Sequence, residues 1–355
     1  MRKSIHCFWC FALFLVIFMY YGCTKSTSSS GGTYTGWAVG QSFNGYATLL
    51  YTQNDGFSWI RQQIPNLAPA VNLNDISVLN SLDAWCVGGV VNGYGLILNT
   101  VDGGVNWSRV GSQLQIPNAE LMAVHVFDQQ TIWITGKSNR ILYTTDKAVT
   151  WHNFKIDSLV PVNYTSFTAS GSKNLWISGE PVNKSHHDSV AVIMHSSDGG
   201  VTWSQQWLPD SLQGVVHSIF ALDDSTLYAA ADGFILKSFN GGQSWFSTFS
   251  LLNKRLNAVY AEDINNVWAV GNNDALYHTK NAGLAWDTIK PQVTGNNLLG
   301  VTANGAAQKV WIVGSNANNV GKGIILYSNN DGVTWFIEDY PVDAGLNKVA
   351  FAPGQ

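Results

Sequence analysis

The chain has 355 residues, of which 46% are apolar and 12% are charged, and its formal net charge is −4. It carries no basic cluster, which excludes a nucleic-acid-binding protein as the expected class. Of the four cysteines only Cys86 lies beyond residue 23, so no internal disulfide is expected in the main domain. Flanked by Trp85 and Val87, it is expected to be a buried apolar side chain.

The N-terminal segment has the layout of a secretory signal. Arg2 and Lys3 precede an uncharged apolar run over residues 8–21, which is shorter than the roughly 20 residues that cross a membrane. A basic start, an apolar middle and a small residue at the cut are typical of a signal peptide. We therefore predict a signal peptide over residues 1–22.

The predicted cut before Cys23 resembles a bacterial lipoprotein signal, although Tyr20 stands where that family has an aliphatic residue. The resemblance implies that Cys23 is lipidated and anchors the chain to a membrane of the bacterial cell envelope, in the periplasm or at the cell surface. The alternatives are ordinary secretion with an incidental cysteine, or an uncleaved anchor. Residues 24–32 contain no apolar side chain, and residues 23–33 are predicted to be a flexible tether.

A turn motif of eight residues recurs seven times. It reads Ser/Thr, any, Asp/Asn, any, Gly, any, small or polar, Trp, as in Ser196–Trp203, and these places are called positions 1 to 8 below. Asp, Asn and Gly tolerate the backbone angles of tight turns, and short polar side chains can bond the local backbone. The residues at positions 3 and 8, predicted to be structural, are Asn54 and Trp59, Asp102 and Trp107, Asp146 and Trp151, Asp198 and Trp203, Asn240 and Trp245, Asn281 and Trp286, and Asn330 and Trp335.

Each motif lies within a longer repeat. Residues 256–261, 267–271, 275–279 and 285–289 alternate as short strands around polar turns, which predicts an antiparallel meander. The second strand opens on an aromatic residue in every repeat, at spacings of 40 to 52 residues: Trp37, Trp85, Trp133, Trp176, Tyr228, Trp268 and Trp311. Four strands per repeat of this length predict a β-propeller.

The first repeat lacks a first strand, and residues 346–351 read as a first strand with nothing after it. Pairing the two would remove two open strand edges. We therefore predict an all-β domain over residues 34–355: a seven-bladed propeller of four-stranded antiparallel blades, closed by the C-terminal strand.

The motif resembles the Asp-box, or BNR repeat, of sialidases and related propellers, in which these boxes are architectural. The aromatic second strand followed by the box also resembles the photosystem II stability/assembly factor-like family. Its members are single propellers, often lipid-anchored, that act as assembly scaffolds without turnover. The photosynthetic members hold their client with an arginine patch that is absent here, so the resemblance implies a different client.

The candidate ligand face lies opposite the turn motifs, where the second and third strands join and where the first strands begin. Aromatic, amide and charged side chains there suit a sugar or a peptide, although ordinary solvated loops would look the same. The candidates are Phe43, Tyr46, Tyr94, Glu180, His186, His187, Asp188, Trp207, His217 and Asn257. The first strands are expected to line the channel mouth with Asn74, Met122, Thr165, His217, Asn257, Leu299 and Asn347.

Catalytic residues are not evident. The arginine triad of sialidases is missing, and the adjacent His186 and His187 lack the partner spacing of a metal site. We expect no cofactor, no metal and no catalysis, and predict a monomeric, lipid-anchored scaffold that binds another macromolecule. The alternative is a carbohydrate-binding protein or a glycoside hydrolase of sialidase or xyloglucanase type, using acids such as Asp75, Glu180 and Asp188.

Overall fold

The computed structural model describes residues 33–64, 71–111, 119–156, 161–182, 191–208, 215–319 and 321–353. Residues from Gly32 onward form one compact unit, separate from Met1–Gly31. The predicted signal peptide, Cys23 and nearly all of the tether therefore lie outside the described residues. Within the described part, no helix is long and apolar enough to cross a membrane.

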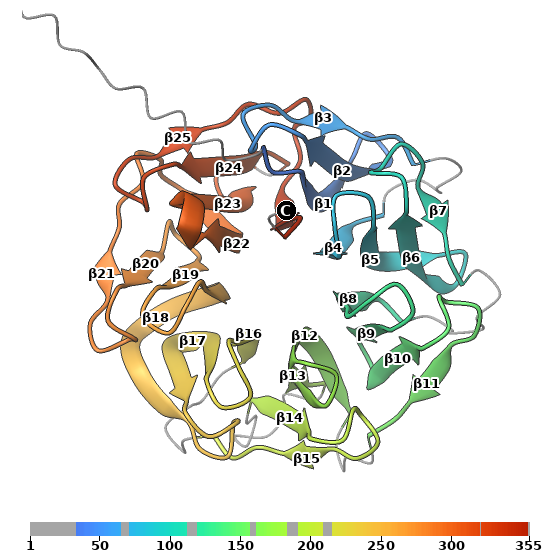
Figure 1. The fold of residues 1–355 in the computed structure, drawn as a ribbon. Coiled ribbons are helices and arrows are strands. Elements are labelled where there is room, and N and C mark those ends of the chain that lie inside the picture. Colours follow the sequence, from blue (N-terminus) through green and yellow to red (C-terminus); the bar gives the residue numbers. More distant parts are fainter. Residues whose placement is uncertain are drawn as a thin grey trace, which may run out of the picture. The chain divides into compact units, whose positions relative to one another are not determined.

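The compact unit is a ring of antiparallel sheets, with the longer strands near the centre and short strands at the outside (Figure 1). A single 3₁₀ turn, η1 (Gly305–Ala307), follows β22. Five sheets have four strands, in these orders: β26(Leu346–Phe351)–β1(Gly36–Phe43)–β2(Tyr46–Thr52)–β3(Ile60–Arg61); β4(Leu73–Val78)–β5(Ala84–Val91)–β6(Tyr94–Thr100)–β7(Ser108–Arg109); β8(Leu121–Val126)–β9(Ile132–Gly136)–β10(Arg140–Thr144)–β11(His152–Phe154); β12(Val162–Ser170)–β13(Asn174–Pro181)–β14(Val192–Ser196)–β15(Ser204–Gln205); and β22(Asn296–Asn304)–β23(Lys309–Asn316)–β24(Gly323–Ser328)–β25(Phe336–Ile337).

The remaining sheet has the order β16(Val216–Ala221)–β17(Leu227–Ser238)–β18(Phe246–Ala261)–β19(Val267–Gly271)–β20(Leu276–Thr279)–β21(Asp287–Thr288). The first part of β17 pairs with β16 and its last part with β18, and Gly233 between them has a φ of 78°. The beginning of β18 pairs with β17, while its end pairs with β19. Divided at these two points, the sheet becomes two four-stranded blades. The described residues then hold seven blades, numbered here in chain order from β1.

The C-terminal strand closes the ring as predicted. β26 pairs antiparallel with β1, from Gly36 opposite Phe351 to Gly40 opposite Leu346. Leu346 and Val349 are buried in the same apolar cluster as Ala38. The two ends of the described chain therefore share blade 1.

The turn motif has the same hydrogen bonds in all seven copies. The position 1 hydroxyl donates to the position 3 side-chain oxygen at 2.8–3.0 Å. The same hydroxyl accepts from the position 5 N–H at 2.8–3.1 Å. The position 3 oxygen accepts from the position 7 N–H at 2.9–3.0 Å. These contacts explain why the sequence repeats Ser/Thr at position 1 and Asp/Asn at position 3.

Positions 4 and 5 both have a positive φ in every copy. This conformation favours glycine, and position 5 is glycine except at Ala148. Position 4 is glycine in three copies and Asp55, Lys147, Ala282 or Asp331 in the others. The second left-handed residue could not be recognised from the sequence because position 4 varies.

Neighbouring blades are joined through this left-handed pair. Trp176 of blade 4 donates from Nε1 to the position 4 carbonyl of blade 5, Gly241 O, at 3.0 Å. Trp311 of blade 7 makes the same contact with Asp55 O of blade 1 at 2.7 Å. Both tryptophans are buried, so blades 4 and 7 each hold the turn of the next blade.

In blade 5, other residues make the corresponding contact with the position 4 carbonyl of the next blade. Blade 5 has Tyr228 in place of tryptophan, and the fully buried Lys237 donates from Nζ to Ala282 O of blade 6 at 2.8 Å. The Lys237 ammonium lies 4.8 Å from the centre of the Tyr228 ring, which compensates part of the cost of burying the charge. Burial lowers the pKa of Lys237.

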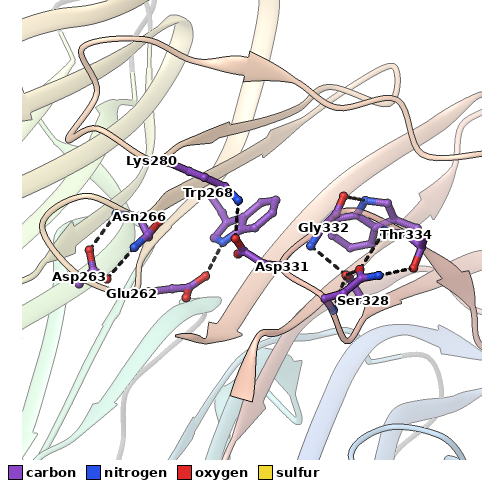
Figure 2. A network of polar contacts seen from close by, with 11 residues as sticks. Glu262, Asp263, Asn266, Trp268, Lys280, Ser328, Asp331, Gly332 and Thr334 are labelled. Carbon is purple, nitrogen blue, oxygen red and sulfur yellow. Dashed lines mark hydrogen bonds and ion pairs between the residues drawn. The ribbon is translucent and has the colours of Figure 1, made fainter. Parts of the chain in front are cut away.

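Figure 2 shows the junction between blades 6 and 7. Trp268 lies beside the turn that Ser328 and Gly332 form, and its Nε1 donates to Glu262. Lys280, at position 2 of one turn motif, pairs with Asp331, at position 4 of the next. This junction therefore joins successive turn motifs by an aromatic contact and an ion pair.

At Gly200, position 5 of the fourth turn motif, glycine is required by space as well as by conformation. A Cβ on Gly200 would lie 2.2 Å from Cη2 of Trp133 in the preceding blade, and the φ of Gly200 is 89°. We expect Gly200→Ala to lower the free energy of unfolding by about 3 kcal/mol in urea titrations. The control is Gly171→Ala, which has a φ of 63° but no atom within 4 Å, and should cost about 1 kcal/mol. Equal losses in the two variants would contradict the proposed packing role of Trp133.

Candidate functional site

The centre of the ring is a polar channel. A cavity of about 350 Å³ is lined by the inner strand of every blade. All seven residues predicted for the channel mouth line it: Asn74, Met122, Thr165, His217, Asn257, Leu299 and Asn347. The predicted lining of the channel by the first strands is therefore confirmed, while the binding role of these residues stays a prediction.

Several of these side chains hold the ring together. The side-chain amides of Asn74, Asn257 and Asn347 each donate at 2.8 Å to a backbone carbonyl of the next blade, at Leu121, Leu298 and Leu73 respectively. Their recurrence at one repeat position is explained by this architecture. Asn257 additionally donates to Asn272 at 2.7 Å, so its amide is engaged on two sides.

The polar groups of His217 and its neighbours form a cluster at the channel mouth between blades 5 and 6. His217 Nε2 lies 2.9 Å from Asp232 Oδ1, and its Nδ1 lies 3.4 Å from Arg255 Nη2. Arg255 also donates from Nε to Asn257 at 3.0 Å. Because a guanidinium can only donate, we assign His217 Nδ1 as the acceptor and Nε2–H as the donor to Asp232.

The electrostatics of this mouth cluster favour an ionised carboxylate. Desolvation by itself would raise the pKa of Asp232, but the hydrogen bond from His217, the Val215 N–H and the charge of Arg255 together lower it. Arg255 is exposed and extends the cluster toward solvent. An exposed guanidinium beside an imidazole and an amide suits recognition of carbonyl or carboxylate groups.

The sequence placed His217 and Asn257 at this face but did not connect them with Asp232 and Arg255. The sequence pattern indicated this cluster only weakly, because Asp232 lies in the tight turn inside β17 and Arg255 lies within the long strand β18. Register brings the two together, since Asp232 is the strand partner of Arg255. Such a register could not be foreseen from the single repeat.

The other candidates are spread over several blades. Phe43 ends β1 and packs partly buried against the core, while Tyr46 begins β2 and is 62% exposed, with the Arg61 guanidinium carbon 5.7 Å from its ring centre. Tyr94 begins β6 in blade 2 and is half-buried. Trp207 follows β15 in blade 4 and is 83% exposed.

The charged candidates of blade 4 are less informative. Glu180 lies in β13 opposite Asn163. His186, His187 and Asp188 lie outside the described residues. Among the residues described, no group of three or more His, Cys, Asp or Glu side chains could hold a metal ion.

Carboxylates near the channel face serve the fold. Buried Asp75 accepts from Val124 N at 2.9 Å, and its pKa is raised mainly by desolvation. Asp274 accepts from Gly295 N at 2.6 Å and from Asn296. A glycoside hydrolase requires a pair of carboxylates facing a substrate, and these two are instead used in hydrogen bonds to the backbone.

A carboxylate with a raised pKa, Glu262, lies at the opposite end of the ring. Desolvation, together with the charges of Asp331 and Asp263, raises the pKa of Glu262 to about 7, although the bond from Trp268 and the charge of Lys280 oppose the shift. Shifted carboxylates often mark active sites, but structural networks shift them too. The contacts of Glu262 belong to the blade junction of Figure 2.

This shift predicts a pH dependence. Since the pKa of Glu262 is higher in the folded than in the unfolded chain, its stabilising contribution is complete below about pH 4.5 and is lost as the pH rises through 7. Glu262→Gln, which can still accept from Trp268, should raise the free energy of unfolding at pH 8 by about 1–2 kcal/mol, allowing for partial exposure. At pH 4 the gain should vanish.

Denaturant titrations at both pH values measure the difference. The exposed Asp287→Asn is the control and should show no such pH-dependent gain. A Glu262→Gln variant that is less stable than the native chain at pH 8 would contradict the assignment.

Comparisons with known proteins agree with the fold. A Sortilin-Vps10 family model (Sortilin, neurotensin receptor 3) matches residues 95–226. The photosystem II assembly lipoprotein Ycf48 of Synechococcus sp. (strain CC9902) is 29% identical over 116 residues. That match spans 32% of this chain and only 32% of the relative.

Solved structures match over more of the ring. YCF48 bound to D1 peptide gives a TM-score of 0.63 at 18% identity, covering 85% of this chain and 90% of that one. YCF48 from Cyanidioschyzon merolae gives 0.57 at 21% identity, covering 77% and 86%. A streptogramin B lyase gives 0.58 at 15% identity, covering 79% and 90%. At these identities the likeness shows the fold alone.

The sheets and the matches define this protein as a β-propeller, which confirms the predicted fold class. Within that class it resembles Ycf48, with 29% identity over 116 residues to the assembly lipoprotein and the same fold as the two YCF48 structures.

Proposed function

We propose that the chain is a lipid-anchored propeller of the bacterial cell envelope that binds another protein as a non-catalytic assembly scaffold. The observation that carries the proposal is the 29% identity to an assembly lipoprotein. The structure of YCF48 bound to D1 peptide adds that a propeller similar to this one accepts a peptide. The lipobox-like position of Cys23 supports anchoring.

The channel face is the proposed client surface. Its mouth cluster presents the exposed Arg255 beside His217, and the guanidinium can bond peptide carbonyls or a carboxylate. Trp207, in blade 4, adds an exposed aromatic side chain on a neighbouring blade. Exposed Trp and Arg are frequent anchors of protein interfaces.

Non-catalytic binding is favoured because the acidic groups beside the channel are engaged. Asp75, Asp232 and Asp274 all accept hydrogen bonds from the fold. Their arrangement leaves binding as the property that the described site supports best.

The test is affinity capture from the source cell's solubilised envelope, with residues 33–355 as bait. A client held by the native domain should be lost with the Arg255→Gln/Trp207→Ala double variant, with at least a tenfold fall in recovery. Lys173→Gln, which removes an exposed charge in the turn between β12 and β13, is the control and should capture the client normally.

The captured protein is identified by mass spectrometry and confirmed by reciprocal capture. Capture that survives the double variant would contradict the proposed client surface. Binding of glycans alone, measured on an array, would instead favour carbohydrate recognition.

A further inference from the structure

Position 6 of the turn motif carries an exposed apolar side chain in six of the seven copies. These residues, called the apolar rim, are Phe57, Val105, Val149, Val201, Leu284 and Val333, and they are 55–88% exposed. The seventh copy has Gln243. The hydrogen bonds that define the turn use positions 1, 3, 5 and 7, so the turn itself does not require an apolar residue at position 6.

The apolar rim lies at one end of the ring. Every turn motif connects the third to the fourth strand of its blade with the same hydrogen bonds, so position 6 recurs at the same level around the ring. Neighbouring positions add further exposed apolar side chains at Leu82, Val101, Phe239 and Ile264. Single exposed apolar residues are ordinary, but many on one face mark an interaction surface.

The chain enters the ring at this same end. Tyr34 N donates to Asp55 Oδ1 at 2.8 Å, and Asp55 N donates to Tyr34 O at 3.3 Å. Asp55 is position 4 of the first turn motif, next to Phe57. Only about ten residues separate Tyr34 from Cys23, a reach of about 35 Å when fully extended. An anchor at Cys23 would therefore hold this end of the ring close to the membrane.

We propose that the apolar rim rests on the surface of a lipid bilayer, so that the channel face points away from the membrane. The proposal rests on the anchoring proposed above for Cys23. An apolar surface spread around a ring fits a flat, deformable partner such as a bilayer interface, into which single Val, Leu and Phe side chains can insert. It also explains why the mouth cluster and Trp207 remain accessible to a client.

The charges of this end indicate which lipids suit it. Hydrogen bonds from position 7 and from the position 1 hydroxyl lower the pKa of Asp102 and lower those of Asp146 and Asp198 to about 2. These carboxylates stay ionised beside the apolar rim, while the exposed Lys147 and Lys173 lie at the same end, so this end carries both signs of charge and has no single attraction to anionic headgroups. Zwitterionic phosphatidylcholine is therefore the expected surface.

The test uses an environment-sensitive fluorophore on single cysteines introduced at Val201→Cys and Leu284→Cys. The control is Ser138→Cys, an exposed turn residue between β9 and β10 at the opposite end. Cys86 is fully buried and should not compete for the label. The lipidated chain is reconstituted in phosphatidylcholine vesicles, and the domain over residues 33–355 is examined with the same vesicles.

Fluorescence at Val201 and Leu284 should shift to the blue and be quenched by spin-labelled lipid, while Ser138 should not respond. Replacing Val105, Val201 and Leu284 by threonine should lower vesicle binding of the isolated domain roughly tenfold, because less apolar area is buried. Aqueous emission at both rim positions, or an equal response at Ser138, would overturn the proposal. A shift that appears without vesicles and grows with protein concentration would overturn it in favour of a second copy.

The anchor is tested separately, by incorporation of a labelled fatty acid into the native chain and into Cys23→Ala. Equal labelling of the two would refute the anchoring, while the isolated domain would still decide whether the apolar rim binds lipid.

Discussion

Contacts between neighbouring blades depend on two adjacent left-handed residues, positions 4 and 5, in each turn motif. These residues turn the position 4 carbonyl toward the preceding blade, where Trp176 and Trp311 donate to it from buried positions. A buried carbonyl without a partner would cost about 1–3 kcal/mol. The Ser/Thr and Asp/Asn side chains of the motif hold this conformation. The same side chains that form the turn therefore also orient the carbonyl that contacts the preceding blade.

The repeat allowed the strands, the closure by β26 and the channel lining to be predicted from the sequence. Its periodicity marks which residues begin each strand, and strand direction then follows. The contacts between blades could not be predicted, because the tryptophan at one repeat position donates to the next turn in blades 4 and 7 but to a carboxylate of its own blade in blades 2 and 6. Asn257 was predicted to be a ligand group, whereas the structure shows its amide bonded to a carbonyl of the next blade, and Lys237 was not singled out at all.

The candidate site could likewise be predicted only in part from the repeat. His217 and Asn257 were recognised because the repeat aligns them, whereas Asp232 and Arg255 join them only through the register between β17 and β18. The aromatic candidates Tyr46, Tyr94 and Trp207 lie in blades 1, 2 and 4. Composition suggested a binding face, but the distances between side chains depend on tertiary packing.

The two ends of the ring differ in chemistry. One has hydrogen-bonded carboxylates beside exposed apolar side chains and receives the N-terminal segment, and the other has a polar channel mouth with an exposed guanidinium. In a scaffold such a division separates attachment from recognition. Side-chain contacts near the turn-motif end join blades 4 to 5, 5 to 6, 6 to 7 and 7 to 1.

At three junctions of the described ring a buried donor, from Trp176, Lys237 or Trp311, holds the turn of the next blade, and blade 5 offers the most direct test. In blade 4, Trp176 stacks on His195 with ring centres 4.7 Å apart, at the repeat positions of Tyr228 and Lys237. We expect Lys237→His alone to lower the free energy of unfolding by about 1–3 kcal/mol, because Ala282 O loses its partner.

The decisive measurement is the urea titration of the double variant Tyr228→Trp/Lys237→His beside the two single variants. We expect the double variant to recover most of the free energy of unfolding lost in Lys237→His, because tryptophan restores a donor to the same carbonyl. A double variant no more stable than the sum of the single effects would contradict this expectation.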